Sequence, residues 1–250
     1  MKVEKFVKDR GNKYKVYIDG EEFKLYDDVI VKYSLGLVKD IDEDKLNEIL
    51  TYNSEMSSYY LSIKYLTNKM KAEKEIRDYL HKHEISDSII DKTIERLKGQ
   101  GYLNENVYLK AFINDAINLS DKGPFKIRKE LNKLGFYDEQ IDEYLDKYDN
   151  TFWTTRVENI IDKKIKLNKN KSSYAIKNKI LLDLQNLGYN KETISGVLST
   201  IKINEKDAYL LEYEKAKKKL SKKYEGFELE QKIKMQLYRK GFKIGDYYEE

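Results

Sequence analysis

The sequence predicts a mainly α-helical protein made of tandem three-helix repeats, which form an elongated curved stack, with a small β-hairpin or meander region at its N-terminus. The first observation behind this prediction is a pattern, Ile-x3-Leu-x4-aromatic, that recurs four times. Its copies are Ile76–Leu80–Ile85, Ile127–Leu131–Phe136, Ile180–Leu184–Tyr189 and Ile233–Leu237–Phe242, with an isoleucine in the aromatic place of the first. The Ile positions lie 51, 53 and 53 residues apart, and such a period is typical of repeat proteins. The second observation is an alternation of apolar and polar residues near the N-terminus, which indicates strands.

The composition agrees with a repeat protein. Apolar residues make up 40% of the 250 residues and charged residues 37%, which suits thin layers that contact only their neighbours better than one thick core. A single proline leaves long helices unbroken. The absence of cysteine excludes disulfides, thiol catalysis and cysteine-ligated metals. Because no apolar stretch is long enough to span a membrane and no secretory signal opens the chain, we expect a cytoplasmic protein.

The first 26 residues predict strands. Tyr14, Val16 and Ile18 alternate with polar residues, and glycine-containing turns stand at residues 10–12 and at Asp19-Gly20. Asp-Gly favours a two-residue hairpin turn because glycine accepts positive φ. We expect two hairpins that make a three-stranded meander, which leans on the first helices because it is too small to stand alone.

The period becomes helical from Asp27 onward. We expect a short helix over residues 27–35 that stops at Gly36. The acidic stretch at residues 40–44 precedes Leu46, and acidic residues favour the positive end of a helix, so a second helix begins there. A calcium loop is the alternative, but its sixth position would be Lys45 instead of glycine, and its twelfth Thr51 instead of glutamate.

Helical signals then divide the chain into an N-terminal part and four repeats. We expect a β-hairpin extension with linking helices over 1–55, repeats over 56–103, 104–149 and 150–203, and a partial fourth repeat over 204–250 that acts as a C-terminal cap. Asparagine is a good N-cap, and we expect N-caps at Asn104, Asn150 and Asn204. Glycine closes helix ends in the left-handed conformation, as we expect for Gly135, Gly188 and Gly241. Pro124 fits a first helical turn.

Catalytic and cofactor signatures are missing from the sequence. His81 and His83 lie two residues apart on a helix and point in different directions, so they cannot hold one metal ion together. No phosphate-binding glycine loop, dinucleotide fingerprint or nucleophile-elbow serine occurs. We therefore expect no enzyme activity, no metal and no cofactor.

Positive charge is concentrated at the C-terminal end. Residues 151–250 hold 22 basic and 14 acidic residues, whereas residues 1–50 hold 10 and 12. Such a stretch attracts a polyanion or an acidic protein face, or it is simply a lysine-rich solvated surface. Phe152 and Trp153 stand beside Arg156, and one of these adjacent rings must point away from the main core, toward a neighbouring repeat or a partner. The candidate partner-binding residues are Lys126, Lys129, Arg156, Lys163, Lys164, Lys215 and Lys219.

Two strings resemble a known family. Lys122-Gly123-Pro124 followed by Ile127, Glu130-Leu131 and Leu134-Gly135-Phe136 resembles the middle repeat of the RecX family, the regulators of the recombinase RecA. The stretch from Leu97 to Glu105 is similar to that family's link between first and second repeats, and the resemblance covers about residues 57–242. The chain departs from the family pattern at Lys69 and Ala72, where arginine and serine are usual.

The resemblance implies a cytoplasmic, monomeric interaction protein and not an enzyme. Such a protein would bind the RecA filament on single-stranded DNA, lie in the filament groove, and restrain ATP hydrolysis, strand exchange and coprotease activity. The alternative is a helical-repeat protein that binds DNA directly through its basic C-terminal repeats. Direct DNA binding would weaken steeply with salt, because counterions are released from the phosphates.

Overall fold

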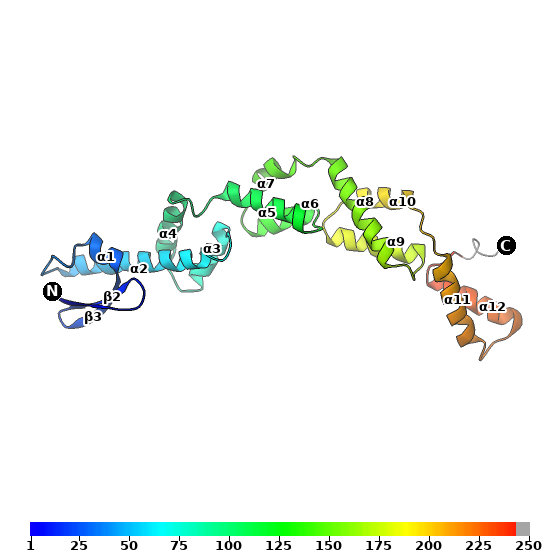
Figure 1. The fold of residues 1–250 in the computed structure, drawn as a ribbon, viewed down its shortest axis with the longest axis horizontal. Helices are drawn as coiled ribbons and strands as arrows, with labels where there is room; N and C mark the ends of the chain where they lie inside the picture. Colours follow the sequence, from blue (N-terminus) through cyan, green and yellow to red (C-terminus); the bar gives the residue numbers. More distant parts are fainter. Residues whose placement is uncertain (244–250) are drawn as a thin grey trace. The chain divides into compact units, whose positions relative to one another are not determined.

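The N-terminal strands form the expected meander. In the computed structural model, which describes residues 1–243, β1 (Val3–Lys8), β2 (Lys13–Ile18) and β3 (Glu21–Tyr26) pair antiparallel in the order β1-β2-β3 (Figure 1). Asp19 and Gly20 both take positive φ, 47° and 81°, which is the backbone that a tight two-residue hairpin requires. The prediction of two hairpins is confirmed.

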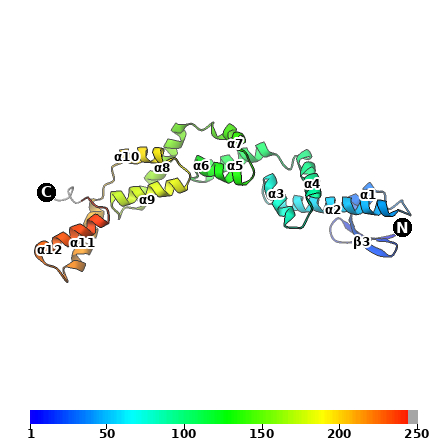
Figure 2. The same cartoon turned by 180° about the vertical axis from the view of Figure 1, so that it is seen from behind.

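One face of this sheet builds a core with the first two helices, α1 (Asp27–Lys32) and α2 (Glu43–Leu66). Val16, Ile18 and Leu25 are fully buried in it. Both views show the sheet along one side of α2 (Figures 1 and 2). The Asp42 carboxylate accepts a hydrogen bond from the Lys45 amide at 2.7 Å, so the acidic stretch is a helix start, as predicted.

The end predicted for the first helix is wrong. α1 stops at Lys32, before Leu35, because Ser34 adopts the left-handed conformation at φ 51° and breaks the helical path. α2 runs without interruption across residues 55 and 56, where the sequence suggested the start of the first repeat.

The chain divides into two compact units, Met1–Lys110 and Ala111–Glu250, and the division falls within α5 (Glu105–Leu119). In the first unit, α2 contacts α3 (Glu73–His81) and α4 (Asp87–Gly99), which also contact each other. This makes a three-helix group around Ile76, Leu80 and Ile90.

The second unit continues the helical repeats. Its further helices are α6 (Pro124–Lys133), α7 (Asp138–Leu145), α8 (Asn150–Leu167), α9 (Ser173–Asn186), α10 (Lys191–Thr200), α11 (Lys206–Leu220) and α12 (Gly226–Arg239). α6 contacts α7; α8, α9 and α10 contact one another; and α11 pairs with α12. Among residues 1–243, α11 and α12 are the last helices, and any third helix of the fourth repeat would lie outside the described residues. Within that range, no helix combines the length with the apolar character that crossing a bilayer requires.

The recurring pattern is the core of each repeat. All eight of its Ile and Leu side chains are fully buried, and they belong to α3, α6, α9 and α12, which we call the middle helices. Gly135, Gly188 and Gly241 follow these helices with φ of 94°, 88° and 86°. The predicted glycine caps are therefore confirmed, and so is Pro124 in the first turn of α6.

Two of the three predicted N-caps are wrong in register. Asn104 does accept from the Val107 amide, at 3.1 Å. α8, however, is capped by Asp149, whose carboxylate accepts from the Phe152 amide at 2.8 Å and adds a negative charge at the positive helix end. Asn204 accepts from the Lys206 amide at 3.0 Å but stands one residue before Glu205, the N-cap position of α11.

Candidate partner interface

In the second unit, the start of one middle helix abuts the end of the next. The Gly123 amide donates to the Leu187 carbonyl at 2.7 Å, and the Phe125 amide donates to the Gly188 carbonyl at 3.1 Å. A Cβ on Gly188 would lie 2.3 Å from the Lys126 nitrogen. Such backbone contact leaves no space for a side chain. We call this contact between α6 and α9 the first joint.

The same joint recurs between α9 and α12. The Ser172 hydroxyl, just before α9, donates to the Lys240 carbonyl at 2.6 Å. A Cβ on Gly241 would lie 2.9 Å from Ser172 Oγ and 2.9 Å from Tyr174 Cδ1. Gly188 and Gly241, which follow α9 and α12, thus each lie against the start of the preceding middle helix. We call the contact between α9 and α12 the second joint.

A cationic groove lies at the first joint. It has a volume of about 380 Å³, and its lining residues are Phe125, Lys126, Lys129, Glu130, Lys133, Gln185, Asn186 and Gly188. The Glu130 carboxylate is engaged by Lys122 on the neighbouring turn. Two of the predicted partner-binding lysines, Lys126 and Lys129, therefore come together in a groove with an excess of positive charge.

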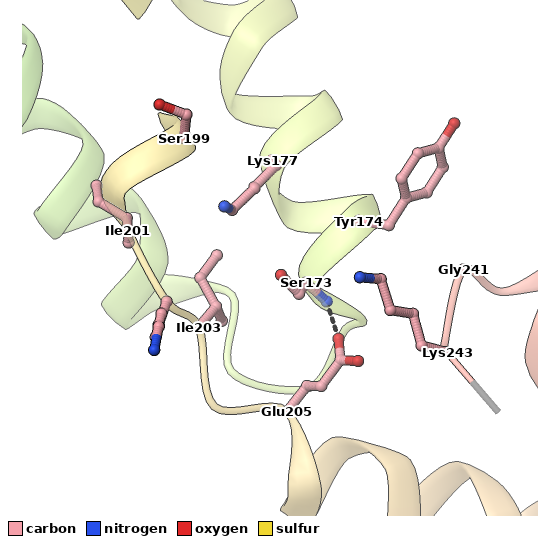
Figure 3. A pocket seen from close by; sticks show the side chains of 10 residues that line it. Ser173, Tyr174, Lys177, Ser199, Ile201, Ile203, Glu205, Gly241 and Lys243 are labelled. Carbon is pink, nitrogen blue, oxygen red and sulfur yellow. Dashed lines mark hydrogen bonds between the residues drawn. The ribbon is translucent and has the colours of Figure 1, made fainter. Parts of the chain in front are cut away.

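A second groove, of about 590 Å³, lies beside the second joint (Figure 3). Its lining residues are Ser173, Tyr174, Lys177, Ser199, Ile201, Lys202, Ile203, Glu205, Gly241 and Lys243. The Glu205 carboxylate is buried and accepts from the Ser173 amide, so it belongs to the structure of the joint. Lys177 points between α9 and the segment after α10, where its Nζ donates to the Leu198 carbonyl at 2.6 Å. The groove is again rich in lysine.

Exposed aromatic rings stand at the same position of three middle helices, and two of them, Phe125 and Tyr174, lie beside the joints. Phe125, Tyr174 and Phe227 are each the second residue of a middle helix, and they are 57%, 65% and 80% exposed. The sequence pattern did not reveal them, because Phe125 precedes the repeat isoleucine by two residues whereas Tyr174 and Phe227 precede theirs by six. Large aromatic residues that stay exposed are typical of binding surfaces.

Arg156, by contrast, is used within the fold. Its guanidinium donates to the carbonyls of Ile117 and Ser120, both at 2.8 Å, and its Nε lies 3.4 Å from Tyr189 Oη. Burial raises the pKa of Tyr189, which keeps this phenol neutral. The adjacent Trp153 is buried, and its indole donates to the Tyr148 carbonyl at 3.0 Å. The Phe152 ring packs beside Tyr148 and Trp153, with ring centres 4.8 and 5.1 Å apart, so both rings of the aromatic pair pack inside the second unit.

The remaining predicted lysines lie on α8 and α11 and do not share a groove. Lys164 pairs with Asp183 at 2.7 Å, and Lys215 pairs with Glu212 at 2.8 Å. Lys163 and Lys219 are exposed, and neither makes an ion pair with an acidic side chain of residues 1–243. Across the same residues, no cluster of histidine and carboxylate side chains has the arrangement of a metal site.

Comparison with known proteins identifies the family. Residues 59–97 match the family model described as the first three-helix domain of RecX. A regulatory protein RecX of Bacillus cytotoxicus is 32% identical over 261 aligned positions, which cover 98% of this chain and 93% of the relative. The chain belongs to the RecX family. A RecX of Bacillus cereus is 34% identical, again over 98% of this chain and 93% of the relative.

Solved RecX structures share the fold. One crystal structure of the regulatory protein RecX aligns with a TM-score of 0.66 at 21% identity, covering 79% of this chain and 98% of the other. The RecX of Lactobacillus salivarius aligns with a TM-score of 0.53 at 23% identity, covering 59% of this chain and 96% of the other.

Proposed function

We propose that this chain regulates the RecA recombinase by binding the RecA filament on single-stranded DNA and restraining ATP hydrolysis, strand exchange and coprotease activity. The observation that carries the proposal is membership of the RecX family along almost the whole chain, with relatives that are named as regulatory proteins. In this role the chain acts by occupying a surface, as a monomer in the cytoplasm, and none of its residues is assigned a catalytic step.

The joint grooves are the surface that we assign to this contact. Both lie beside an exposed aromatic ring, both are lined by several lysines, and both sit where one repeat meets the next. Two lysine-lined grooves at successive joints suit a partner that is itself built from repeated subunits. Lys126 and Lys129 then contact the partner directly, whereas Arg156 supports the fold behind the grooves.

The test is RecA-catalysed ATP hydrolysis on single-stranded DNA at increasing concentrations of this chain. We expect hydrolysis to fall, and we expect the K126E/K129E variant to need roughly tenfold more protein for the same effect, because charge reversal replaces attraction by repulsion. K64E/K69E is the matched control, since both lysines are exposed and lie outside the grooves. Unchanged hydrolysis at saturating wild-type protein would defeat the inhibitory proposal.

Direct DNA binding by the C-terminal repeats is a second candidate. The basic excess of residues 151–250 favours it, as do the exposed Lys163 and Lys219, which make no ion pair with acidic side chains of residues 1–243. It predicts binding to naked DNA that weakens steeply between about 50 and about 200 mM salt. Binding that K163E/K219E leaves intact would remove these two lysines from the contact.

A further inference from the structure

The outer face of the N-terminal sheet is a separate feature of the first unit. Val16 and Ile18 of β2 are fully buried on the side that packs against the helices. Successive side chains of a strand point to opposite faces, so Lys15 and Tyr17 lie on the side away from that core. The strand register adds their neighbours on β1 and β3. The outer face consists of Lys5, Val7, Lys15, Tyr17, Glu22 and Lys24. Lys13 lies at its end, where the register pairs it with Tyr26, whose ring is buried against α2.

The contacts across the strands agree with this assignment. Lys5 Nζ lies 4.3 Å from the centre of the Tyr17 ring. Lys15 Nζ lies 3.0 Å from Glu22 Oε1, and the Tyr17 hydroxyl donates to Glu22 Oε2 at 2.8 Å. The one acidic side chain of the face is therefore engaged by two neighbours. Lys13 Nζ lies 4.5 Å from the centre of the Tyr26 ring. Lys5, Lys13 and Lys24 make no ion pair with the acidic side chains of residues 1–243.

Basic and acidic side chains of residues 1–50 are unequally distributed between the two sides of the N-terminal sheet. Residues 1–50 hold more acidic than basic residues, 12 against 10, yet the outer face holds three lysines and one glutamate, with Lys13 at its end. Two of the acidic residues, Asp28 and Glu48, lie on the helical side, where they accept from Tyr60 and Tyr33. A region of net negative charge thus presents one positive surface, and such a surface selects anionic partners.

A sheet face that carries an aromatic ring, Tyr17, among lysine side chains is suited to binding single-stranded nucleic acid. Unpaired bases stack on aromatic side chains, while lysines meet the phosphates of the same strand. A duplex would bring phosphates to these lysines but keep its bases away from Tyr17. We propose that the outer face of the β1–β3 sheet binds single-stranded nucleic acid, with Tyr17 as the stacking residue and Lys5, Lys13 and Lys24 as the phosphate contacts.

The experiment uses the full chain and a fluorescent thymidine oligonucleotide, without RecA, so its outcome is independent of the proposed RecA regulation. Affinity is measured by anisotropy between about 50 and about 200 mM salt. We expect K5Q/K13Q/K24Q to bind more weakly and to reduce the slope of log affinity against log salt by about 2, since each lost phosphate contact on a single strand contributes about 0.7.

The control K64Q/K69Q/K82Q removes the same charge from exposed lysines elsewhere in the first unit. Equal losses in both triple variants would show that only net charge matters and would overturn the proposal. Tighter binding to the duplex than to the single strand would also overturn it. So would binding to anionic lipid vesicles with no binding to the oligonucleotide.

Tyr17 is tested separately. Y17L should weaken binding about tenfold, because stacking on an aromatic ring is lost, whereas Y17F should stay close to wild type. Photocrosslinking of the unmodified protein to a 5-iodouracil oligonucleotide removes any concern over folding of the variants. We expect crosslinks to peptides of β1 and β2, and crosslinks confined to the second unit would contradict the assignment.

Discussion

Single glycines decide how successive repeats in the second unit meet. Gly188 carries both a left-handed backbone, at φ 88°, and a contact that leaves no room for a Cβ. Gly101 has a similar φ of 77° but open space around it. The two residues therefore separate the cost of backbone strain from the cost of close packing. The sequence predicted that Gly188 ends a helix. It did not predict that Gly188 contacts the start of α6, because the contacting residues are more than sixty positions apart.

Gly188→Ala should destabilise the protein more than Gly101→Ala. Strain at positive φ costs about 1 kcal/mol in either variant. Gly188→Ala also forces the first joint apart, which adds about 1 to 3 kcal/mol as in other overpacked sites. The measurement is the free energy of unfolding from urea titration of both variants. Equal losses would mean that the first joint opens without cost.

At the scale of elements, pairs of helices are held by side chains that the linear pattern does not connect. The carboxylate of Glu212 on α11 accepts from Lys215 of the same helix and from Lys240 at the end of α12. The hydrogen bond from Lys215, followed by that from Lys240, lowers the pKa of Glu212 below its ordinary value. The contact links α11 to α12 beyond their apolar core of Ala216, Ile233 and Leu237.

The Glu212 contact predicts a pH-dependent contribution to stability. Because the folded-state pKa lies below the unfolded-state value, the contribution is fully present above about pH 4.5 and is lost as the pH falls through the folded-state pKa. Glu212→Gln should therefore lower the melting temperature near neutral pH, and the difference from wild type should shrink in acid. Thermal melts followed by circular dichroism at several pH values give the comparison. A difference that stays constant down to strongly acidic pH would rule out ionisation of Glu212 as its source.

Across the whole molecule, the helical repeats present similar surface features more than once. Phe125 and Tyr174 occupy the same helical position beside the first and second joints, and both are more than half exposed. Their equivalence is visible only when helix starts are aligned, because α9 is four residues longer than α6. In the sequence, the two rings stand at different distances from the repeat isoleucine, so their equivalence appears only in the folded structure.

If the two rings serve equivalent sites, Phe125→Ala and Tyr174→Ala should each weaken binding to RecA filaments by a similar factor. The double variant should lose about the product of the two factors, since separated sites contribute independently. Tyr137→Ala is the control, because this ring is 73% exposed but lies outside both grooves. Cosedimentation with filaments on single-stranded DNA measures the effect. A control variant that binds as weakly as the groove variants would show that exposed rings contribute without regard to place.

The fold class, the N-terminal meander and the buried Ile and Leu of the four copies could be predicted from the sequence, because apolar periodicity and turn residues act locally along the chain. The helical period also placed Lys126 and Lys129 on one helix. Contacts in the folded chain were needed to show that these lysines border a groove and that Phe125 and Tyr174 are counterparts. The same holds for Arg156, which donates to the carbonyls of Ile117 and Ser120. The physical reason is that exposure and hydrogen-bond partners depend on contacts between distant segments, which hydrophobic period does not encode.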